Sequence, residues 1–277
     1  MQTYLKDCRW DRFILLRGDL ISQNVDMYGE WAEAEVDLFR ALLPANGICV
    51  EVGSNMGLHA IPLSIICEHG RIYAYEPQRP IFHILCGNIA LNNRLNIVAR
   101  NLAVGEQCGE IEIETSDYER PWNYGAFSLL SGFSTEARFN GSVWNDKVAM
   151  VALDKDPELA SLSRVDFIKV DAEGHEPQVL RGACNLIARH KPNIFLEFSS
   201  AKQLEEIHEV LQPQGCRGYW FFASRFRPQN FGASAFQVGG YDTNIIFLPE
   251  GRELPVGSLK PVIGPNDVNI PVLTSFP

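Results

Sequence analysis

From residue 47 onward, short apolar runs alternate with segments in which apolar residues recur at helical spacing. The runs cover residues 47–53, 71–77, 96–104, 165–171, 193–199, 218–224 and 243–249. Strands this apolar are buried on both faces, and short strands alternating with helices are typical of a parallel sheet. The alternation therefore predicts an α/β protein with a mostly parallel sheet and helices on both faces.

The remaining segments frame this domain, which spans residues 47–249. Residues 1–46 are predicted to form an N-terminal helical cap, because Val36, Phe39 and Leu43 share one helical face. Residues 105–164 interrupt the alternation and predict a β-rich insertion that could serve as a substrate lid. Residues 250–277 contain five prolines and are predicted to be an extended C-terminal tail.

Composition excludes several classes of protein. The 277 residues carry a net charge of −10, which argues against a nucleic-acid partner held by bulk electrostatics. The seven cysteines form no CxxC pair, which favours free thiols in a reducing compartment. The N-terminus has no signal-peptide pattern and no apolar run approaches about 18 residues, so neither secretion nor membrane insertion is expected. A cytoplasmic protein is predicted, and its oligomeric state is left open.

The first chemical motif is the turn in "ICVEVGSNMGLHA", where a buried strand runs into Gly53 and Gly57 before a helix. Ligands bind at such turns, outside the carboxyl ends of the strands of open α/β sheets. A dinucleotide fingerprint would place a second glycine at Asn55. The nearby carboxylate of Glu51 would repel a pyrophosphate, but it suits a ligand with an ammonium or sulfonium group.

The next strand ends in Glu76, 23 residues after Gly53. An acidic residue at this place can accept hydrogen bonds from both ribose hydroxyls of an adenosine group. Alone it could also be an ordinary strand end. Together the two motifs predict a nucleoside cofactor.

The strings "VEVGSNMG", "AYEP", "NLAVG" and "DFIKVDAEGHEPQVLRG", followed by "IFLEFS", resemble the FkbM-type methyltransferases. The resemblance covers roughly residues 47–200. It implies a class I, Rossmann-like seven-stranded fold, S-adenosylmethionine as cofactor, and methylation of a hydroxyl of a sugar or natural product. It places Glu51, Gly53, Asn55 and Gly57 around the methionine part of the cofactor, Glu76 on the ribose, and the backbone near Ala103 on the adenine. His59 and Pro62 depart from the family pattern, and Pro62 predicts a kink or a late start of its helix.

The second chemical motif is the acidic end of the strand at 165–171, followed by Glu173, His175 and Glu176. If the strand persists beyond Asp171, then Asp171, Glu173 and His175 point the same way. Glu176 and Pro177 suit the start of a helix, so Glu176 is interpreted as a helix-start residue.

Three roles remain open for this group. We favour His175 as the general base for methyl transfer to oxygen, with Asp171 or Glu173 orienting the ring. The group could instead hold a divalent metal ion, with Glu197 as a further ligand. The carboxylates could also accept hydrogen bonds from substrate hydroxyls. The purely structural alternative is that the group only caps the strand and the helix.

Candidates for acceptor binding come from the insertion and from the strand at 193–199. Trp122, Asn123, Tyr124 and Ser128 combine aromatic surface with polar groups, and Glu197 is a carboxylate in an apolar strand. Tyr28 and Trp31 are weaker candidates for the same wall. Any of them could simply be packing residues.

The leading hypothesis is an S-adenosylmethionine-dependent O-methyltransferase acting on a hydroxyl of a small molecule or glycan. A nicotinamide-dependent oxidoreductase is the alternative enzyme, disfavoured by Glu51 and the missing glycine. A non-catalytic nucleoside-binding scaffold is the alternative outside the enzymes.

Overall fold

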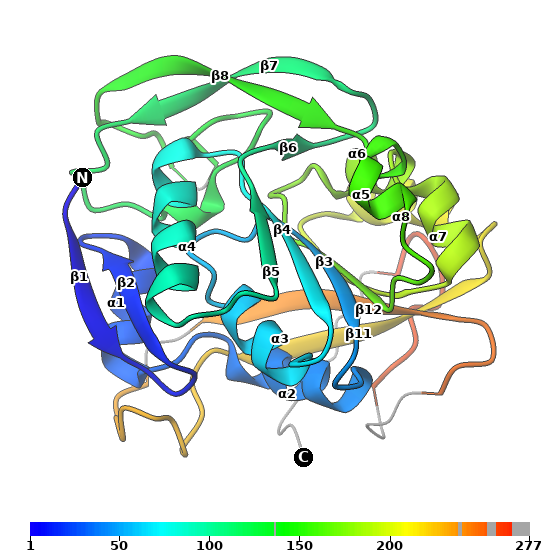
Figure 1. The fold of residues 1–277 in the computed structure, drawn as a ribbon, viewed down its shortest axis with the longest axis horizontal. Helices are drawn as coiled ribbons and strands as arrows, with labels where there is room; N and C mark the ends of the chain where they lie inside the picture. Colours follow the sequence, from blue (N-terminus) through cyan, green and yellow to red (C-terminus); the bar gives the residue numbers. More distant parts are fainter. Residues whose placement is uncertain (136, 238–239, 254–258, 268–277) are drawn as a thin grey trace.

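The computed structural model describes residues 1–135, 137–237, 240–253 and 259–267. Its centre is a seven-stranded sheet with the strand order β5-β4-β3-β9-β10-β12-β11 (Figure 1). The strands are Ile97–Arg100 (β5), Arg71–Tyr75 (β4), Ile48–Val52 (β3), Phe167–Val170 (β9), Asn193–Glu197 (β10), Tyr241–Pro249 (β12) and Cys216–Ser224 (β11). Pairs from β5 to β10 are parallel, whereas β12 runs antiparallel to both of its neighbours. This arrangement confirms the predicted mostly parallel, Rossmann-like fold.

Two hydrophobic clusters fill the two faces of the sheet, because side chains alternate along each strand. On one face, α2 (Glu33–Leu42) and α3 (Ala60–Ile66) pack in the cluster that holds Phe167 and Phe195, and α4 (Arg79–Leu91) extends it. On the other face, the cluster around Ile168 and Val170 is covered by α6 (Glu176–Arg181), α7 (Cys184–His190) and α8 (Ala201–Leu211). Figure 1 shows these two groups of helices on opposite sides of the strands.

The predicted strand at 96–104 is divided in two. β5 ends at Arg100, and β6 (Ala103–Val104) leaves the central sheet to pair with β8. Between them, Asn101 Nδ2 donates to the carbonyl oxygens of Glu76 and Pro77, both at 2.9 Å. These bonds turn the chain across the end of β4 and bring Leu102 and Val104 over it.

The N-terminal segment is mixed rather than wholly helical. It begins with the antiparallel hairpin of β1 (Thr3–Asp7) and β2 (Arg12–Leu16), and α1 (Leu20–Tyr28) and α2 follow. The helical prediction missed the hairpin because the alternating burial of β2, with Phe13 and Leu15 inside, spans only five residues. In α2 the predicted face is confirmed, since Val36 and Phe39 are fully buried.

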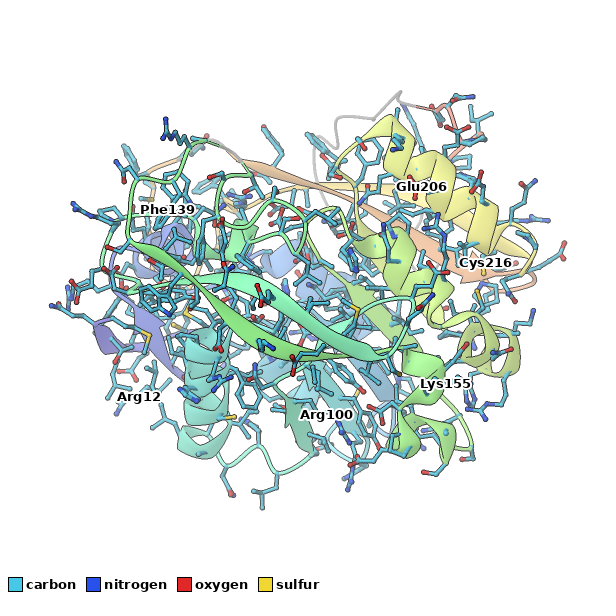
Figure 2. The ribbon with its side chains drawn as sticks, turned by 90° about the horizontal axis from the view of Figure 1, so that it is seen from above. Arg12, Arg100, Phe139, Lys155, Glu206 and Cys216 are labelled. Atoms are coloured by element: carbon cyan, nitrogen blue, oxygen red, sulfur yellow. The ribbon has the colours of Figure 1, made fainter. Side chains whose placement is uncertain are left out.

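The insertion contains the predicted extra strands. β7 (Gly109–Ser116) and β8 (Val143–Val151) form a long antiparallel pair, and β6 joins it to make a separate three-stranded sheet. Between β7 and β8, the chain forms the short 3-10 helix η1 (Tyr124–Ala126). Figure 2 shows the β7–β8 pair lying across the molecule when it is viewed from above.

The remaining short elements are η2 (Leu153–Lys155) and α5 (Pro157–Ala160). Helix α3 starts late, at Ala60, so that Pro62 lies in its first turn where no backbone donor is lost. This is one of the two outcomes predicted for Pro62.

The C-terminal tail is described only in part, and residues 254–258 and 268–277 of the predicted tail lie outside the described residues. The described part runs along β11, where Trp220 N–H donates to the Lys260 carbonyl and Val262 N–H to that of Gly218, both at 2.9 Å. It therefore shields an edge strand of the sheet.

Replacing Phe39 with alanine should test how α2 is held on the sheet. The ring lies 5.1 Å from that of Phe167 and 5.2 Å from that of Phe195, measured between centroids. Truncation leaves a cavity, so we expect a loss of about 3–5 kcal/mol in the free energy of unfolding measured with urea. Leu95→Ala is the control, because Leu95 is 81% exposed and its loss should change stability by less than about 0.5 kcal/mol.

Candidate active site

A cavity opens at the carboxyl ends of β3, β4, β9 and β10, on the face covered by α2 and α3. Its empty volume is about 1170 Å³, part of it open to solvent. Besides the strand ends, the lining includes residues of the N-terminal segment, the insertion and β12: Leu20, Ile21, Trp31, Glu35, Asn123, Gly125, Ala126, Phe127, Leu129, Asp242 and Asn244.

The turn after β3 depends on two glycines. Gly53 has a φ of +78°, and an added Cβ would lie 1.8 Å from the carbonyl oxygen of Asp171. Gly57 has a φ of +89°, and an added Cβ would lie 2.7 Å from Leu85 Cδ1. Asn55 between them also has a positive φ, of 48°. The turn can therefore pass close to the end of β9 only with glycine at position 53.

Glu76 is held rigidly at the end of β4. One carboxylate oxygen accepts from the backbone N–H of Asn55 at 2.9 Å, and the other accepts from that of Gln78 at 2.8 Å. The side chain is 3% exposed, and burial raises its pKa to about 7 despite these two hydrogen bonds. Glu76 thus joins the glycine turn to the next strand and still lines the cavity.

Glu51 and Lys169 are cross-strand neighbours in the register of β3 and β9. Both are 1% exposed. Burial raises the pKa of Glu51 to about 7, although the Lys169 ammonium opposes the shift. Burial would lower the pKa of Lys169, but Asp171, Glu51 and Glu35 together raise it above its ordinary value. Lys169 therefore remains an ammonium at the floor of the cavity, and Oε2 of Glu51 faces that cavity without a hydrogen-bond partner.

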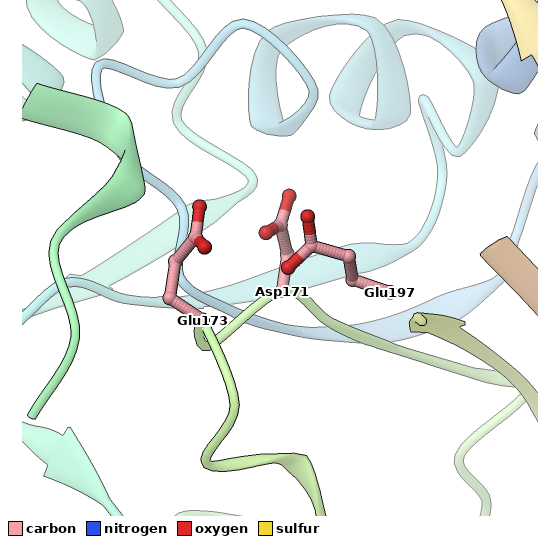
Figure 3. A group of neighbouring side chains, drawn as sticks. All are labelled: Asp171, Glu173 and Glu197. Carbon is pink, nitrogen blue, oxygen red and sulfur yellow. The ribbon is translucent and has the colours of Figure 1, made fainter. Parts of the chain in front are cut away.

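Three carboxylates converge beside this pair, and we call Asp171, Glu173 and Glu197 the carboxylate cluster (Figure 3). Each contributes an oxygen that lies within 4.8 Å of those from the other two. The Lys169 Nζ lies 3.0 Å from Asp171 Oδ2. Burial, and then Asp171 and Glu173, raise the pKa of Glu197 well above its ordinary value.

His175 does not join the cluster, and the expectation that it points the same way as Asp171 and Glu173 is wrong. β9 ends at Val170, and positive φ angles of 49° at Glu173 and 91° at Gly174 reverse the chain. His175 precedes α6, is 7% exposed, is absent from the cavity lining and lies against Gly105 of the insertion. Burial lowers its pKa. This position does not support the role of general base or of metal ligand.

Glu176 has the structural role that the sequence suggested. It lies in the first turn of α6 and is fully buried. Its Oε1 accepts from the N–H of Ala172 at 2.8 Å, and its Oε2 accepts from the side chain of Gln203 on α8. Glu176 therefore fixes the loop that carries Glu173.

Of the five residues predicted to bind the acceptor, two line the cavity and three do not. Asn123 and Glu197 line the cavity. Trp122 donates to the Phe133 carbonyl, and Tyr124 is 1% exposed with its hydroxyl donating to the Arg120 carbonyl. Ser128 pairs with Gly132 in the same loop. These three stabilise the insertion, and its contribution to the wall comes instead from Asn123, Gly125, Ala126, Phe127 and Leu129.

Two further predictions concern single positions. Trp31 lines the cavity, whereas Tyr28 is 1% exposed and packs its ring against that of Phe226. Ala103 is fully buried in β6, and the residues on either side of it, Leu102 and Val104, line the cavity.

Several residues that line the cavity were not predicted from the sequence. Glu35 on α2 accepts from Asn244 Nδ2 at 3.0 Å, and its Oε2 lies 3.6 Å from His59 Nε2. Arg225 binds the carboxylate of Asp242 and lies over the ring of Trp31, 5.1 Å from its centroid. Lys169 had a visible signal, as a lone charge in an apolar strand, whereas Arg225 and Asp242 become neighbours only when β11 and β12 pair.

The sequence profile of the methyltransferase FkbM domain matches residues 51–219, more than half of the chain. The chain belongs to the FkbM methyltransferase family. The match begins at Glu51 and includes the glycine turn, Glu76 and the whole carboxylate cluster. Most of the residues that line the cavity of this FkbM member thus lie inside the matched segment.

Two curated relatives are methyltransferases. Methyltransferase sdnD of Sordaria araneosa is 29% identical over 172 residues, which are 51% of this chain and 62% of that protein. The hexuronic acid methyltransferase AglP of Haloferax volcanii is 26% identical over 158 residues, 55% of this chain and 58% of that protein. The FkbM chain thus matches about six-tenths of the length of either relative.

Solved structures with a similar fold are more distant. The FkbM methyltransferase of Methylobacillus flagellatus is 17% identical with a TM-score of 0.46, covering 76% of this chain and 47% of that one. Fibrillarin of Aeropyrum pernix with bound S-adenosylmethionine is 12% identical with a TM-score of 0.43, covering 89% and 82%. Membership of the FkbM family rests on the sequence match and not on these two structures.

Removing the charge of Lys169 should show how strongly the buried carboxylates depend on it. Lys169→Met leaves Glu51 and Asp171 without their cation, and we expect a loss of about 3–5 kcal/mol in unfolding free energy at about pH 8. The loss should shrink at about pH 5, because burial raises the pKa of Glu51 to about 7 and its protonated carboxyl group no longer needs an ammonium. Urea unfolding at both pH values measures it.

Lys147→Met is the matched control, since Lys147 is exposed and pairs only on the surface with Glu110. It should cost less than about 1 kcal/mol at either pH. An equal loss for the two variants would contradict the assigned role of Lys169.

Proposed function

We propose that this protein transfers the methyl group of S-adenosylmethionine to a hydroxyl oxygen of a small molecule or glycan. The observation that carries the proposal is that two buried carboxylates, Glu51 and Glu76, line the cavity beside the glycine turn. Glu76 is fixed by two backbone N–H groups, and Glu51 presents an unpartnered oxygen to the same cavity. A nucleoside with a cationic amino-acid tail complements both.

The cofactor would lie along the carboxyl ends of β4 and β3. Its ribose hydroxyls would donate to Glu76, and Leu102, Val104 and the backbone on either side of Ala103 would enclose the adenine. Its methionine part would follow the turn from Gly53 through Asn55 to Gly57, with its ammonium towards Glu51. The opposite charges of Glu51 and of the ammonium or sulfonium favour this orientation.

The methyl group would then face the carboxylate cluster. In the reaction, a bond forms between the acceptor oxygen and the methyl carbon, while the bond from that carbon to sulfur breaks. The hydroxyl proton passes to a carboxylate, for which we propose Asp171 or Glu173, with Glu197 holding the acceptor. A cavity that excludes water and holds the oxygen in line with the methyl group supplies further rate.

The two alternative functions fit less well. A nicotinamide cofactor would place its pyrophosphate beside the Glu51 carboxylate, whose Oε2 has no hydrogen-bond partner and would repel it. A scaffold without catalysis gives no reason for three carboxylates to converge within 4.8 Å at the end of the sheet. The wall that Asn123, Phe127 and Leu129 contribute supports the lid role proposed for the insertion.

The acceptor class rests on the family and its relatives. AglP is a hexuronic acid methyltransferase, and a glycan hydroxyl is accordingly one of the acceptors proposed here. No helix in the described part of the chain is long and apolar enough to cross a bilayer. The seven cysteines are unpaired, and a reducing, cytoplasmic location remains a prediction from the sequence.

Glu76 should make cofactor affinity depend on pH. In the free protein this carboxyl takes up a proton as the pH falls through about 7, and a protonated carboxyl accepts ribose hydroxyls poorly. Affinity for S-adenosylhomocysteine should therefore fall roughly 20-fold between about pH 8 and about pH 5.5, measured by calorimetry. Glu76→Gln should bind at least about tenfold more weakly at about pH 8 and show a smaller pH dependence, with the remainder due to Glu51, whose pKa is also raised to about 7.

Turnover should separate the carboxylate cluster from His175. An intact-mass methylation screen across sugars, polyketides, phenols and lipid head groups first provides an acceptor. We then expect Glu173→Gln to lower kcat by about 100-fold or more with cofactor affinity unchanged, because the proton acceptor is weakened. His175→Ala should retain turnover within about threefold, since the ring lies outside the cavity.

Loss of turnover in His175→Ala with a normal thermal stability would restore the histidine as the base. Absence of methylation across the whole screen, together with absence of S-adenosylmethionine binding, would overturn the proposed function.

A further inference from the structure

The carboxylate cluster is short of positive charge. Among the described lining residues, the Lys and Arg side chains are Lys169 and Arg225. Lys169 Nζ is 3.0 Å from Asp171 Oδ2, and Arg225 binds Asp242 through three nitrogen–oxygen contacts of 2.5, 2.8 and 3.0 Å. No lysine or arginine contact is formed by Glu197 in the described structure.

One carboxylate oxygen of Glu197 accepts no hydrogen bond in the structure. Its Oε2 has less than 1 Å² of accessible surface and no hydrogen-bond partner. Glu51, 1% exposed, presents a second such oxygen to the same cavity. A buried carboxylate oxygen without a partner is costly, so its place in a cavity indicates a ligand that donates hydrogen bonds.

The few cations in the lining and the unpartnered oxygen of Glu197 together indicate a cationic ligand, on the premise that the proposed function is correct. We propose that the carboxylate cluster binds a protonated amine of the acceptor, next to the hydroxyl that is methylated. Glu197 receives hydrogen bonds from the ammonium, and Asp171 and Glu173 contribute charge. Held among carboxylates, the amine stays protonated and has no lone pair to attack the methyl group, which leaves the neighbouring hydroxyl as the nucleophile.

A divalent metal ion is a less suitable occupant. The Lys169 ammonium already lies 3.0 Å from Oδ2 of Asp171, one of the three carboxylates that such an ion would use. An ion with two positive charges there would be repelled by the ammonium of Lys169, which is 1% exposed. A single organic cation meets the charge deficit with less repulsion.

Two cofactor analogues test the subsite before any acceptor is known. S-Adenosylhomocysteine has a neutral sulfur at the reactive position, whereas sinefungin carries an ammonium group where the transferred methyl would be. For the unmodified protein at about pH 8, we expect calorimetry to show sinefungin binding at least about tenfold more tightly. Glu197→Gln should reduce this preference at least about fivefold, while the affinity for S-adenosylhomocysteine stays within about threefold.

Glu206→Gln is the control, because Glu206 lies on α8 (Figure 2), outside the cavity. Its carboxylate pairs with Arg181. The variant should leave the preference unchanged. An equal affinity for the two analogues, or a preference that Glu197→Gln leaves intact, would overturn the subsite. Failure of both analogues to bind would overturn the proposed function, and the subsite with it.

Magnesium titrated into the complex with S-adenosylhomocysteine distinguishes the remaining occupant. We expect no stoichiometric binding at millimolar concentration. Binding of one magnesium ion that Glu197→Gln abolishes would replace the amine with a metal site.

Discussion

The active site is organised around the buried ammonium of Lys169. It lies at the floor of the cavity, in register with Glu51 on β3 and 3.0 Å from Asp171 at the end of its own strand. Glu35 adds a third carboxylate from α2. Carboxylates from three elements can approach one another at the same end of the sheet because one cation lies between them. Lys169 therefore couples Glu51, which would meet a sulfonium cofactor, to Asp171, which would meet the acceptor.

The second constraint is the close passage of two loops. The turn after β3 and the loop after β9 approach so closely that Gly53 has no space for a side chain. The loop after β9 then reverses at Glu173 and Gly174, anchored by Glu176 through Ala172 and Gln203. This reversal turns Glu173 into the cavity and carries His175 towards the insertion. Glu176 does not line the cavity itself, but by anchoring this loop it determines that Glu173 lines the cavity and that His175 does not.

The sequence was sufficient to predict the strands, the glycine turn and Glu76, because these depend on local pattern and on the rule that ligands bind at the carboxyl ends of strands. It failed where geometry depends on distant partners. The common direction of Asp171, Glu173 and His175 assumed a strand that in fact ends at Val170. Trp122 and Tyr124 have the composition of a binding wall, but they pack inside the insertion. Arg225, Asp242 and Asn244 reach the cavity only through the pairing of β10, β11 and β12.

The central claim is that the paired carboxylates Glu51 and Glu76 select a nucleoside with a cationic amino-acid tail and reject a pyrophosphate. Calorimetry of the unmodified protein with S-adenosylmethionine and with NAD, under one set of conditions, tests it most directly. We expect one site with micromolar affinity for S-adenosylmethionine and no measurable heat with NAD. Tighter binding of NAD, or binding of neither, would contradict it.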